Sequence, residues 1–313
     1  MTAVVLALGG LVLLLGGAEL LVRSGTTLAG RLGLSPTVIG LTVVSVGTSL
    51  PELAIGIGAA RSGNGDLAAG NIVGTNLVNL MLVLGIGALL HPVAVDRGTR
   101  RVDLPAMVAV TLLLVLLTLG GALDLLGGLV LLGAAAVYLV LVLRRGGEGG
   151  EEDAGSAPPG STPVQALLLV VSLALVVVGA DLLVDGAVEI AQGLGVSDAV
   201  IGLTVVAVGT SAPELVTMVV STLRGATGLA VGNIVGSSVL NIALILGVTV
   251  LAAPGTTIGF PAEVVGGDLV LLAVATVATA LAARSGSRVS RLEGAALVVG
   301  YLAYLTWLLV TRF

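Results

Sequence analysis

Long apolar runs, separated by short polar stretches, fill almost the whole chain. A helix needs about 20 consecutive, mostly apolar residues to cross a bilayer, and ten runs of suitable length can be marked out. They cover residues 2–23, 35–60, 66–90, 102–120, 123–143, 163–191, 197–223, 227–252, 264–283 and 292–311. We therefore predict an all-α integral membrane protein with ten transmembrane helices. The first run has a counterpart in the second half, so we expect a retained helix and not a cleaved signal peptide.

Composition supports a membrane location and narrows the chemistry. Of the 313 residues, 57% are hydrophobic and only 10% are charged, whereas a soluble domain has about 25% charged residues. The mean hydropathy is +1.18. A surface that faced water could not be covered by so few charges. Cysteine is absent from the chain, which excludes disulfides and thiolate metal sites.

Polar residues interrupt two of the apolar runs in nearly the same way. Residues 40–53 read GLTVVSVGTSLPEL, and residues 202–215 read GLTVVAVGTSAPEL, with twelve of fourteen positions identical. The offset from Glu52 to Glu214 is 162 residues. A second pair, GNIVGTNLVN at 70–79 and GNIVGSSVLN at 232–241, repeats at the same offset. The chain is therefore two homologous halves.

The repeats define a domain organisation. We predict a first five-helix repeat at 1–145 with its motif in 40–80, and a second at 163–313 with its motif in 202–242. The stretch 146–162 is rich in Gly, Pro, Ser and acidic residues, a composition that cannot bury a core, so we expect a flexible linker. Because five is an odd number of helices, the second repeat must enter the membrane from the opposite side. The fold class is thus two inverted five-helix repeats.

The arginines indicate the orientation. With the N-terminus outside, only two of them lie on the outer side, and the following eleven lie on the cytoplasmic side: Arg23, Arg31, Arg97, Arg100, Arg101, Arg144, Arg145, Arg224, Arg284, Arg288 and Arg291. This bias follows the positive-inside rule, so we expect both termini outside, the linker in the cytoplasm, and a location in the plasma or inner membrane. Inverted repeats with interrupted apolar segments at matching positions are typical of secondary transporters with a binding site near the membrane midplane.

Each motif copy gathers oxygen atoms on one helix face. Thr48 and Glu52 are four residues apart and therefore lie one turn apart on the same face. Pro51 has no N–H and clashes with the carbonyl group of Gly47, which frees that carbonyl oxygen. Thr75 has the same four-residue spacing from Asn79. The second copy supplies the equivalent residues Thr210, Glu214, Pro213, Gly209, Ser237 and Asn241.

These groups predict a site for a hard cation. Carboxylates, hydroxyls, amide oxygens and freed carbonyls suit Ca²⁺, Mg²⁺ or alkali cations, and flexible oxygen coordination favours Ca²⁺ over Mg²⁺. Two carboxylates neutralise one Ca²⁺. Because a buried carboxylate without a partner is costly by several kcal/mol, the emptied site should take a replacement cation, which favours exchange over leak. Intramembrane carboxylates are functional by default.

Other polar residues have more than one interpretation. The hydroxyls of Ser and Thr in the motifs could instead bond the helix backbone. For Asn71 and Asn233, helix-packing hydrogen bonds and cation ligation are equally open. Glu19 is expected to pair with Arg23 at the cytoplasmic rim. Asp181 and Asp185 would sit near the outer mouth, where their role stays open between solvation and attraction of cations.

The paired Gly-Thr-Ser-x-Pro-Glu segments, each followed by Gly-Asn-Ile-Val-Gly-[Thr/Ser]-x-x-x-Asn, resemble the two alpha-repeats of the sodium/calcium exchangers, in the cation/Ca²⁺ antiporter superfamily. The resemblance covers essentially the whole ten-helix chain. It implies that the protein is a secondary antiporter and not an enzyme. Such an antiporter exchanges three Na⁺ for one Ca²⁺ by alternating access, with helices 1 and 6 sliding across the other eight. It implies no cofactor; the expected partners are the two ions and the bilayer, without nucleic acid. We expect a monomer with no obligatory protein partner.

The resemblance also implies ligands for each ion. Glu52 and Glu214 would bind Ca²⁺ with the backbone carbonyls of Thr48 and Thr210. Flanking Na⁺ sites would use Ser49, Ser211, Thr75 and Ser237, together with backbone carbonyls near Ser45 and Ala207. Asn79 and Asn241 would lie in the middle of the cluster.

The chain departs from some relatives at a few positions. Some prokaryotic members and the potassium-dependent branch carry Asp where this chain has Asn241, so the amide resembles the potassium-independent exchangers. Thr75 replaces the commoner Ser and keeps the hydroxyl. Ser238 stands where the first repeat has Asn76, and this difference has no clear meaning from the sequence.

The same sequence features bear on four other functions. The nearest alternative is a proton-coupled Ca²⁺ antiporter on the same fold, in which the two glutamates carry protons. A cation channel would not need two matched half-sites in opposite orientation. An intramembrane hydrolase would need a nucleophile and a base, and the single histidine, His91, lies at a helix end. A passive scaffold would not need two buried glutamates.

Overall fold

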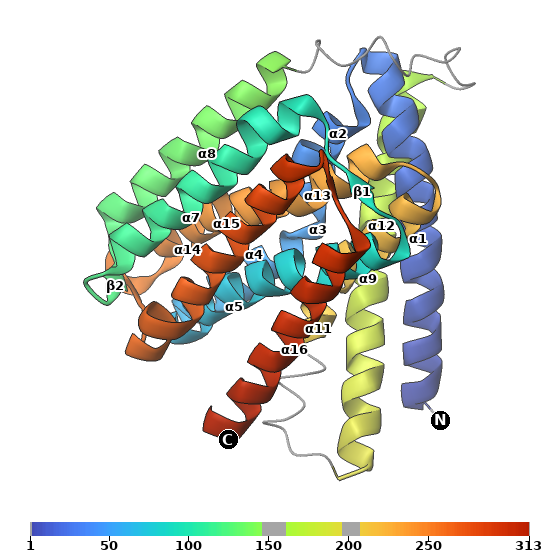
Figure 1. The fold of residues 1–313 in the computed structure, drawn as a ribbon. Coiled ribbons are helices and arrows are strands. Elements are labelled where there is room, and N and C mark those ends of the chain that lie inside the picture. The colour runs from blue at the N-terminus through green and yellow to red at the C-terminus, as the bar shows by residue number, and fades with distance from the viewer. Residues whose placement is uncertain (1, 146–160, 196–206, 313) are drawn as a thin grey trace.

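The computed structural model describes residues 2–145, 161–195 and 207–312. Within these ranges eight helices are long and apolar enough to cross a membrane, and a ninth span is a pair of helices bent by 42°. Of the predicted run 197–223, only the part from residue 207 is described. The all-α membrane fold predicted from the apolar runs is confirmed, and the arrangement of its helices is shown in Figure 1.

In the described residues the two halves share much of their order of elements, and in both halves α-helices are interrupted by short π-helical segments (η). The first half contains α1 (Thr2–Leu32), α2 (Pro36–Ile39), η1 (Gly40–Val44), α3 (Ser45–Thr48), α4 (Leu50–Arg61), α5 (Gly65–Leu77), η2 (Val78–Val83), α6 (Leu84–Leu90), β1 (Val93–Ala94), η3 (Thr99–Asp103), α7 (Leu104–Thr118), β2 (Ala122–Leu123) and α8 (Leu125–Arg145). The second half contains α9 (Thr162–Gly193), α11 (Ala207–Thr210), α12 (Ala212–Leu223), α13 (Thr227–Leu240), η5 (Asn241–Ile245), α14 (Leu246–Ala252), the 3₁₀ turn η6 (Pro254–Thr256), β3 (Ile258–Gly259), η7 (Val264–Asp268), α15 (Leu269–Ser285), β4 (Arg288–Val289) and α16 (Arg291–Arg312).

The first helix is longer than its apolar run. We expected it to end at residue 23, but α1 continues to Leu32. The hydroxyls of Ser24 and Thr26 bond carbonyls one turn back, at 2.8 and 2.7 Å, and so do not compete with the helix. The first residue that stops it is Gly33, which has a positive φ of 66°. Arg23 ends the apolar run, but arginine is a good helix former and the helix continues past it.

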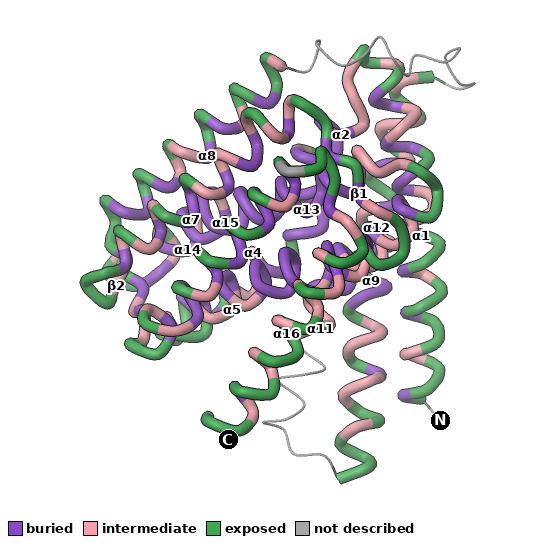
Figure 2. Tube along the Cα trace, viewed as in Figure 1, coloured by how far each residue is buried: buried purple, intermediate pink, exposed green. Residues whose placement is uncertain are grey.

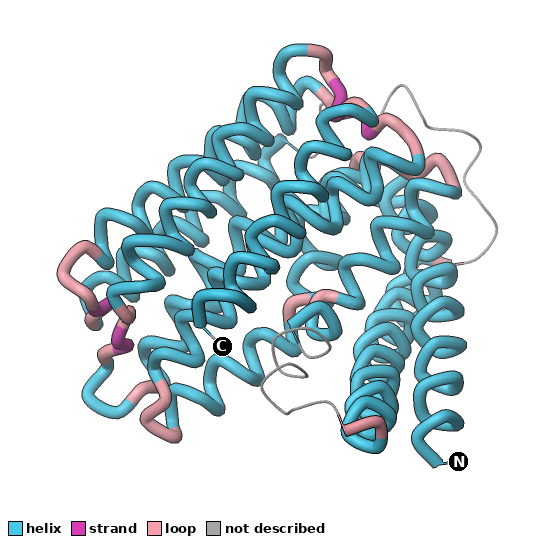
Figure 3. The backbone as a smooth tube through the Cα atoms, turned by 60° about the horizontal axis from the view of Figure 1, so that its bottom comes forward, coloured by secondary structure: helices cyan, strands magenta, loops and turns pink. Residues whose placement is uncertain are grey.

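Two short antiparallel strand pairs join the halves at opposite ends of the molecule (Figure 3). Val93 of β1 lies opposite Val289 of β4, and Leu123 of β2 lies opposite Ile258 of β3. Each pair connects a loop of the first half with a loop of the second. The arginine-rich stretches 97–101 and 284–291 therefore share one end of the molecule.

The two halves interlock, because most helices pack on helices of the other half. α1 lies alongside α9, α13 packs on η1, α16 on α6, α15 on α7, and α14 on α8. Glycines allow the closest contacts: a Cβ on Gly10 or Gly179 would collide with the backbone between α1 and α9, and one on Gly232 would collide with the carbonyl of Thr37. The two halves thus form one packed body.

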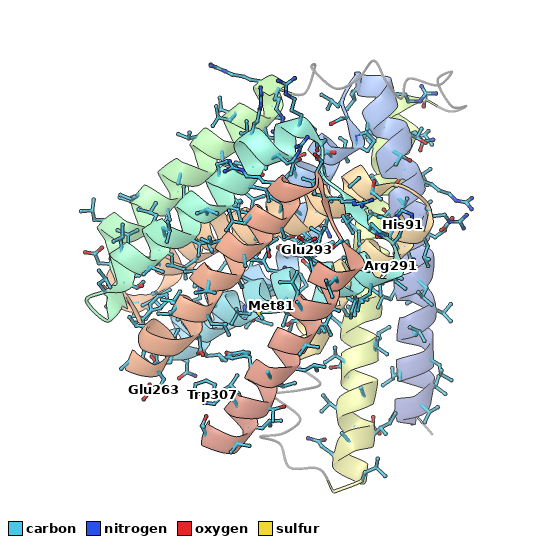
Figure 4. All side chains as sticks on the ribbon, viewed as in Figure 1. Met81, His91, Glu263, Arg291, Glu293 and Trp307 are labelled. Atoms are coloured by element: carbon cyan, nitrogen blue, oxygen red, sulfur yellow. The ribbon has the colours of Figure 1, made fainter. Side chains whose placement is uncertain are left out.

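Burial is greatest at the centre. Figure 2 shows buried residues concentrated around α4, α5 and α13, while α1, α9 and α16 expose much of their length. The span Thr227–Ala252 is 83% buried, whereas Arg291–Thr311 is 11% buried, so the former belongs to the protein core and the latter faces lipid. In Figure 4, α16 runs from Arg291, near His91, to Trp307 near the opposite end.

Candidate functional site

Two broken helices place the motif glutamates. The turn between α3 and α4 falls at Ser49 (φ −88°, ψ 9°), and the turn between α11 and α12 falls at Ser211 (φ −91°, ψ 9°). The two breaks have nearly the same backbone conformation, as repeats of one sequence motif should. Each serine is followed two residues later by a proline, and a glutamate then lies in the first turn of the new helix. The positive end of the helix dipole favours a carboxylate there.

Glu52 and Glu214 face one another in the interior. Both side chains are 0% exposed, and their carboxylates are near enough for electrostatic interaction. The hydroxyls of Thr48 and Ser49 face the Glu214 carboxylate, without a hydrogen bond of good geometry. Neither glutamate has a hydrogen-bond partner for its carboxylate oxygens in the described part of the chain. Two buried carboxylates with free oxygens form a site for positive charge.

The second motif pair surrounds the glutamates with neutral oxygens. Asn79 lies in η2, which packs against α12 and α13, and Asn241 begins η5, which packs against α4 and α5. Both amides are fully buried, and none of their oxygen or nitrogen atoms has a hydrogen-bond partner among the described residues. The π-helical segments add a residue to a helical turn at these positions, a feature that is frequent at functional sites.

The remaining predicted residues differ in how they are held. Ser49, Ser211 and Ser237 are 0% exposed, and their hydroxyls have no partner within the described ranges. Thr75 is buried, and Thr210 is half-buried. The Ser45 hydroxyl donates to the Leu41 carbonyl at 2.8 Å, so its side chain is engaged with the helix as the back-bonding alternative predicted. Of Ala207 only the backbone, at the start of α11, is described.

Asn71 and Asn233, which occupy equivalent positions in the two repeats, make different contacts. Thr48 Oγ1 donates to Asn233 Oδ1 at 3.1 Å, across the two halves. The counterpart Asn71 donates through Nδ2 to the Glu52 carbonyl at 3.4 Å, within its own half. Asn233 is fully buried, and Asn71 is half-buried. In this structure both side chains make helix-packing hydrogen bonds, and they do so asymmetrically.

Charges at the periphery anchor α1. Glu19 pairs with Arg23 at 2.7 Å, which confirms the predicted ion pair, and also with Arg224 at 2.8 Å. Arg224 follows α12, so this second pair joins the first helix to the end of a motif helix. Asp181 and Asp185 are exposed on α9, and their role stays a prediction.

Sequence reasoning did not single out Thr217 and Ser221. They follow Glu214 on α12, are 0% exposed, and have hydroxyls without a partner in the described part of the chain. Their sequence signal is weak, because a hydroxyl inside an apolar helix normally bonds its own backbone.

The oxygen set restricts the chemistry of the site. In the described ranges, no three His, Asp or Glu side chains cluster as a metal site, so the charge of the cluster comes from two glutamates and the other ligands are neutral. Hydroxyl, amide and carboxylate oxygens suit Ca²⁺ and alkali cations. Two negative charges balance one divalent cation.

Comparisons with known proteins agree with this geometry. Residues 2–144 and 164–310 match the family model described as sodium/calcium exchanger protein. CaxA of Alkalimonas amylolytica is 38% identical over 97% of this chain and 98% of its own length. The sodium/calcium exchanger MaX1 of Methanosarcina acetivorans is 33% identical over 95% of each chain. A solved structure of the sodium-calcium exchanger NCX_Mj, soaked with zero Na⁺ and Ca²⁺, superposes with a TM-score of 0.86 at 30% identity, covering 98% of this chain and 99% of that one.

Proposed function

Because the chain belongs to the sodium/calcium exchanger family, we propose that it is a secondary antiporter that exchanges Na⁺ for Ca²⁺ by alternating access. One observation carries the proposal. Two glutamates from oppositely oriented repeats are fully buried against each other at helix breaks, among hydroxyl and amide oxygens that have no protein partner in the described ranges. Such a cluster needs cations for its stability, and the inverted repeats supply two equivalent routes to it.

The glutamates form the proposed Ca²⁺ site, with further ligands from the backbone. Glu52 and Glu214 contribute charge, and the carbonyls of Thr48 and Thr210 complete the coordination. Three Na⁺ would occupy flanking positions and the centre. The side-chain ligands proposed for them are the hydroxyls of Ser49, Ser211, Thr75 and Ser237, and the carbonyls of Ser45 and Ala207 contribute as well. Asn79 and Asn241 lie between the ion positions.

Charge balance explains why exchange is favoured over leak. With one Ca²⁺ the two carboxylates are neutralised, and with three Na⁺ the site carries one net positive charge. The emptied site would hold two uncompensated carboxylates, which is costly in a buried environment. The carrier therefore crosses between its two states with ions bound. Movement of one net charge couples exchange to voltage by about 2.3 kcal/mol per 100 mV.

We place both termini outside the cell and the linker, 146–162, in the cytoplasm of a plasma or inner membrane. Residues 146–160 lie outside the described residues. The N- and C-terminal ends of the described chain lie at one end of the molecule, and α8 ends at the other (Figure 1). The loops with Arg97 and Arg288 are held together by the β1–β4 pair, so the positive-inside rule applies to both at once. The relative YrbG of Escherichia coli is named an inner membrane protein.

The proposed repeats keep the boundaries 1–145 and 163–313, and the protein is proposed to work as a monomer without a resident cofactor. The alternative is proton-coupled Ca²⁺ antiport on the same fold. It deserves a test because CaxA carries the name of an antiporter without a stated ion. In that case the same two glutamates would carry protons.

Ca²⁺ uptake into proteoliposomes distinguishes the two coupling ions. Vesicles loaded with Na⁺ are diluted into Na⁺-free buffer that contains radioactive Ca²⁺ and a proton ionophore. Uptake that requires internal Na⁺ and persists with the ionophore supports Na⁺/Ca²⁺ exchange. Uptake that follows a pH gradient and ignores Na⁺ would assign the chain to the proton-coupled alternative. Vesicles without protein supply the control for leak.

A further inference from the structure

The buried Ser and Thr hydroxyls of this protein fall into two groups. A Ser or Thr inside a helix usually donates to the carbonyl one turn back, and the buried hydroxyls of Ser24, Thr111, Thr118, Thr249 and Thr276 do so at 2.7 to 2.8 Å. In the described part of the chain, the buried Ser and Thr hydroxyls without a partner are those of Ser49, Ser211 and Ser237 at the site, Thr217, Ser221 and Thr222 on α12, and Thr279 on α15. The exceptions outside the site therefore gather on α12.

The α12 hydroxyls continue the face that carries Glu214. Thr217 is three residues and Ser221 seven residues after Glu214, which places both on its face over the next two turns. Both side chains are 0% exposed. Neither hydroxyl bonds a carbonyl of its own helix. The polar surface of the cluster thus extends along α12 away from the glutamates.

Packing does not account for this stripe. An unpaired buried hydroxyl destabilises a protein by about 1–3 kcal/mol, and buried polar groups in native proteins nearly always have partners. A helix that only had to pack would carry apolar residues here. Water and cations are the natural partners of such hydroxyls.

The first half offers a matched comparison. The positions equivalent to Thr217, Ser221 and Thr222 at the 162-residue offset are Ile55, Ala59 and Ala60 on α4. The stripe is therefore a property of one repeat. A requirement of the shared fold would appear in both repeats, and this feature does not.

The stripe ends at an ion pair. Arg224 comes one turn after Ser221 and binds Glu19 of α1 at 2.8 Å, on the face proposed to be cytoplasmic. α1 packs along α12. The hydroxyl stripe therefore runs from the glutamate cluster towards the end of α12 that carries Arg224.

We propose that Thr217 and Ser221 line the passage by which cations move between Glu214 and the face of Arg224. The inference rests on the proposed cation antiport. Hydroxyl oxygens replace part of the hydration of a passing ion, and because they are neutral they do not trap it. They affect the rate of passage and leave the affinity of the glutamate site unchanged.

The first test is transport by a Thr217→Val/Ser221→Ala double variant. We expect its Ca²⁺ exchange rate in proteoliposomes to fall at least tenfold, while equilibrium Ca²⁺ binding in detergent stays within threefold of the wild type. Its thermal stability should be equal or higher, because two unpaired hydroxyls are removed. Thr217→Ser keeps the hydroxyl and should retain the rate. Thr276→Val, which removes a buried hydroxyl bonded to its own helix, is the matched control.

Thiol labelling gives an independent readout, because the native chain contains no cysteine. Ser221→Cys should react with a membrane-impermeant thiol reagent applied from the face of Arg224. The counterpart Ala59→Cys should not react from either face. A double variant that exchanges as fast as the wild type, or a Ser221→Cys protein that never reacts, overturns the passage. A wild type without any cation exchange would instead overturn the proposed function, and labelling would still decide the passage.

Discussion

Replacing Glu214 by glutamine removes one of two charges that face each other in the buried cluster while keeping the shape of the side chain. In the proposed site of the wild type, two carboxylates would neutralise a bound Ca²⁺. In Glu214→Gln the bound complex keeps one uncompensated positive charge, and an uncompensated buried charge costs about 3–5 kcal/mol. Because 1.4 kcal/mol corresponds to a tenfold change in affinity, Ca²⁺ binding should weaken by between about 100-fold and 4,000-fold.

Two measurements on purified protein test this expectation. Calorimetric titration gives the dissociation constant directly. Thermal unfolding gives a second value, since a ligand at 100 times its dissociation constant stabilises the folded state by about 2.7 kcal/mol. At the same Ca²⁺ concentration, a variant with 100-fold weaker binding gains only about 0.4 kcal/mol. Glu263→Gln removes an exposed charge (Figure 4) and serves as the control. A Glu214→Gln protein that binds Ca²⁺ within threefold of the wild type would refute the assignment of this glutamate.

Three further predictions concern groups around the cluster. Asn233→Ala removes the side-chain acceptor of the Thr48 hydroxyl. We expect the Ca²⁺ affinity, measured by titration, to fall about fivefold, because about 1 kcal/mol of hydrogen-bond energy is lost. An unchanged affinity would contradict a role of Asn233 in positioning Thr48. Arg145→Met leaves Asp103, which is 0% exposed and bound at 2.8 Å, without its partner, so the free energy of unfolding should fall by about 3–5 kcal/mol; adding Asp103→Asn should restore most of it. Gly179→Val places a branched side chain against the α1 backbone. It should abolish transport in proteoliposomes, or prevent folding, which size-exclusion chromatography would detect. Normal transport would show that α1 and α9 do not need close contact.

Much of the architecture could be predicted from the sequence because it rests on local patterns. The apolar runs reported the spans, and the repeated Pro51 and Pro213 marked the breaks that the structure has at Ser49 and Ser211. The predicted end of α1 at residue 23 is wrong. Hydropathy shows only where the apolar run ends, whereas a helix continues until a residue such as Gly33 stops it.

Contacts between distant residues could not be predicted. The hydrogen bond from Thr48 to Asn233 joins residues 185 positions apart, and its counterpart Asn71 bonds differently, although the repeats are nearly identical in sequence. The sequence also could not predict that the α12 hydroxyls lack hydrogen-bond partners, because side-chain rotamers decide whether Thr217 and Ser221 bond their own helix.

The interlocking of the halves has a consequence for biogenesis. α1, α6, α7 and α8 each need a partner from the second half, and α4, which carries Glu52, packs on α14 and η5 of that half. Synthesis at about 5–20 residues per second leaves the first repeat in the membrane for roughly 10–30 seconds before its partners are complete. During that time its polar motif has no covering helix and its glycine faces have no contact. The insertion machinery must therefore shelter a half-built protein, and truncation after the linker should yield a product for degradation and not a smaller transporter.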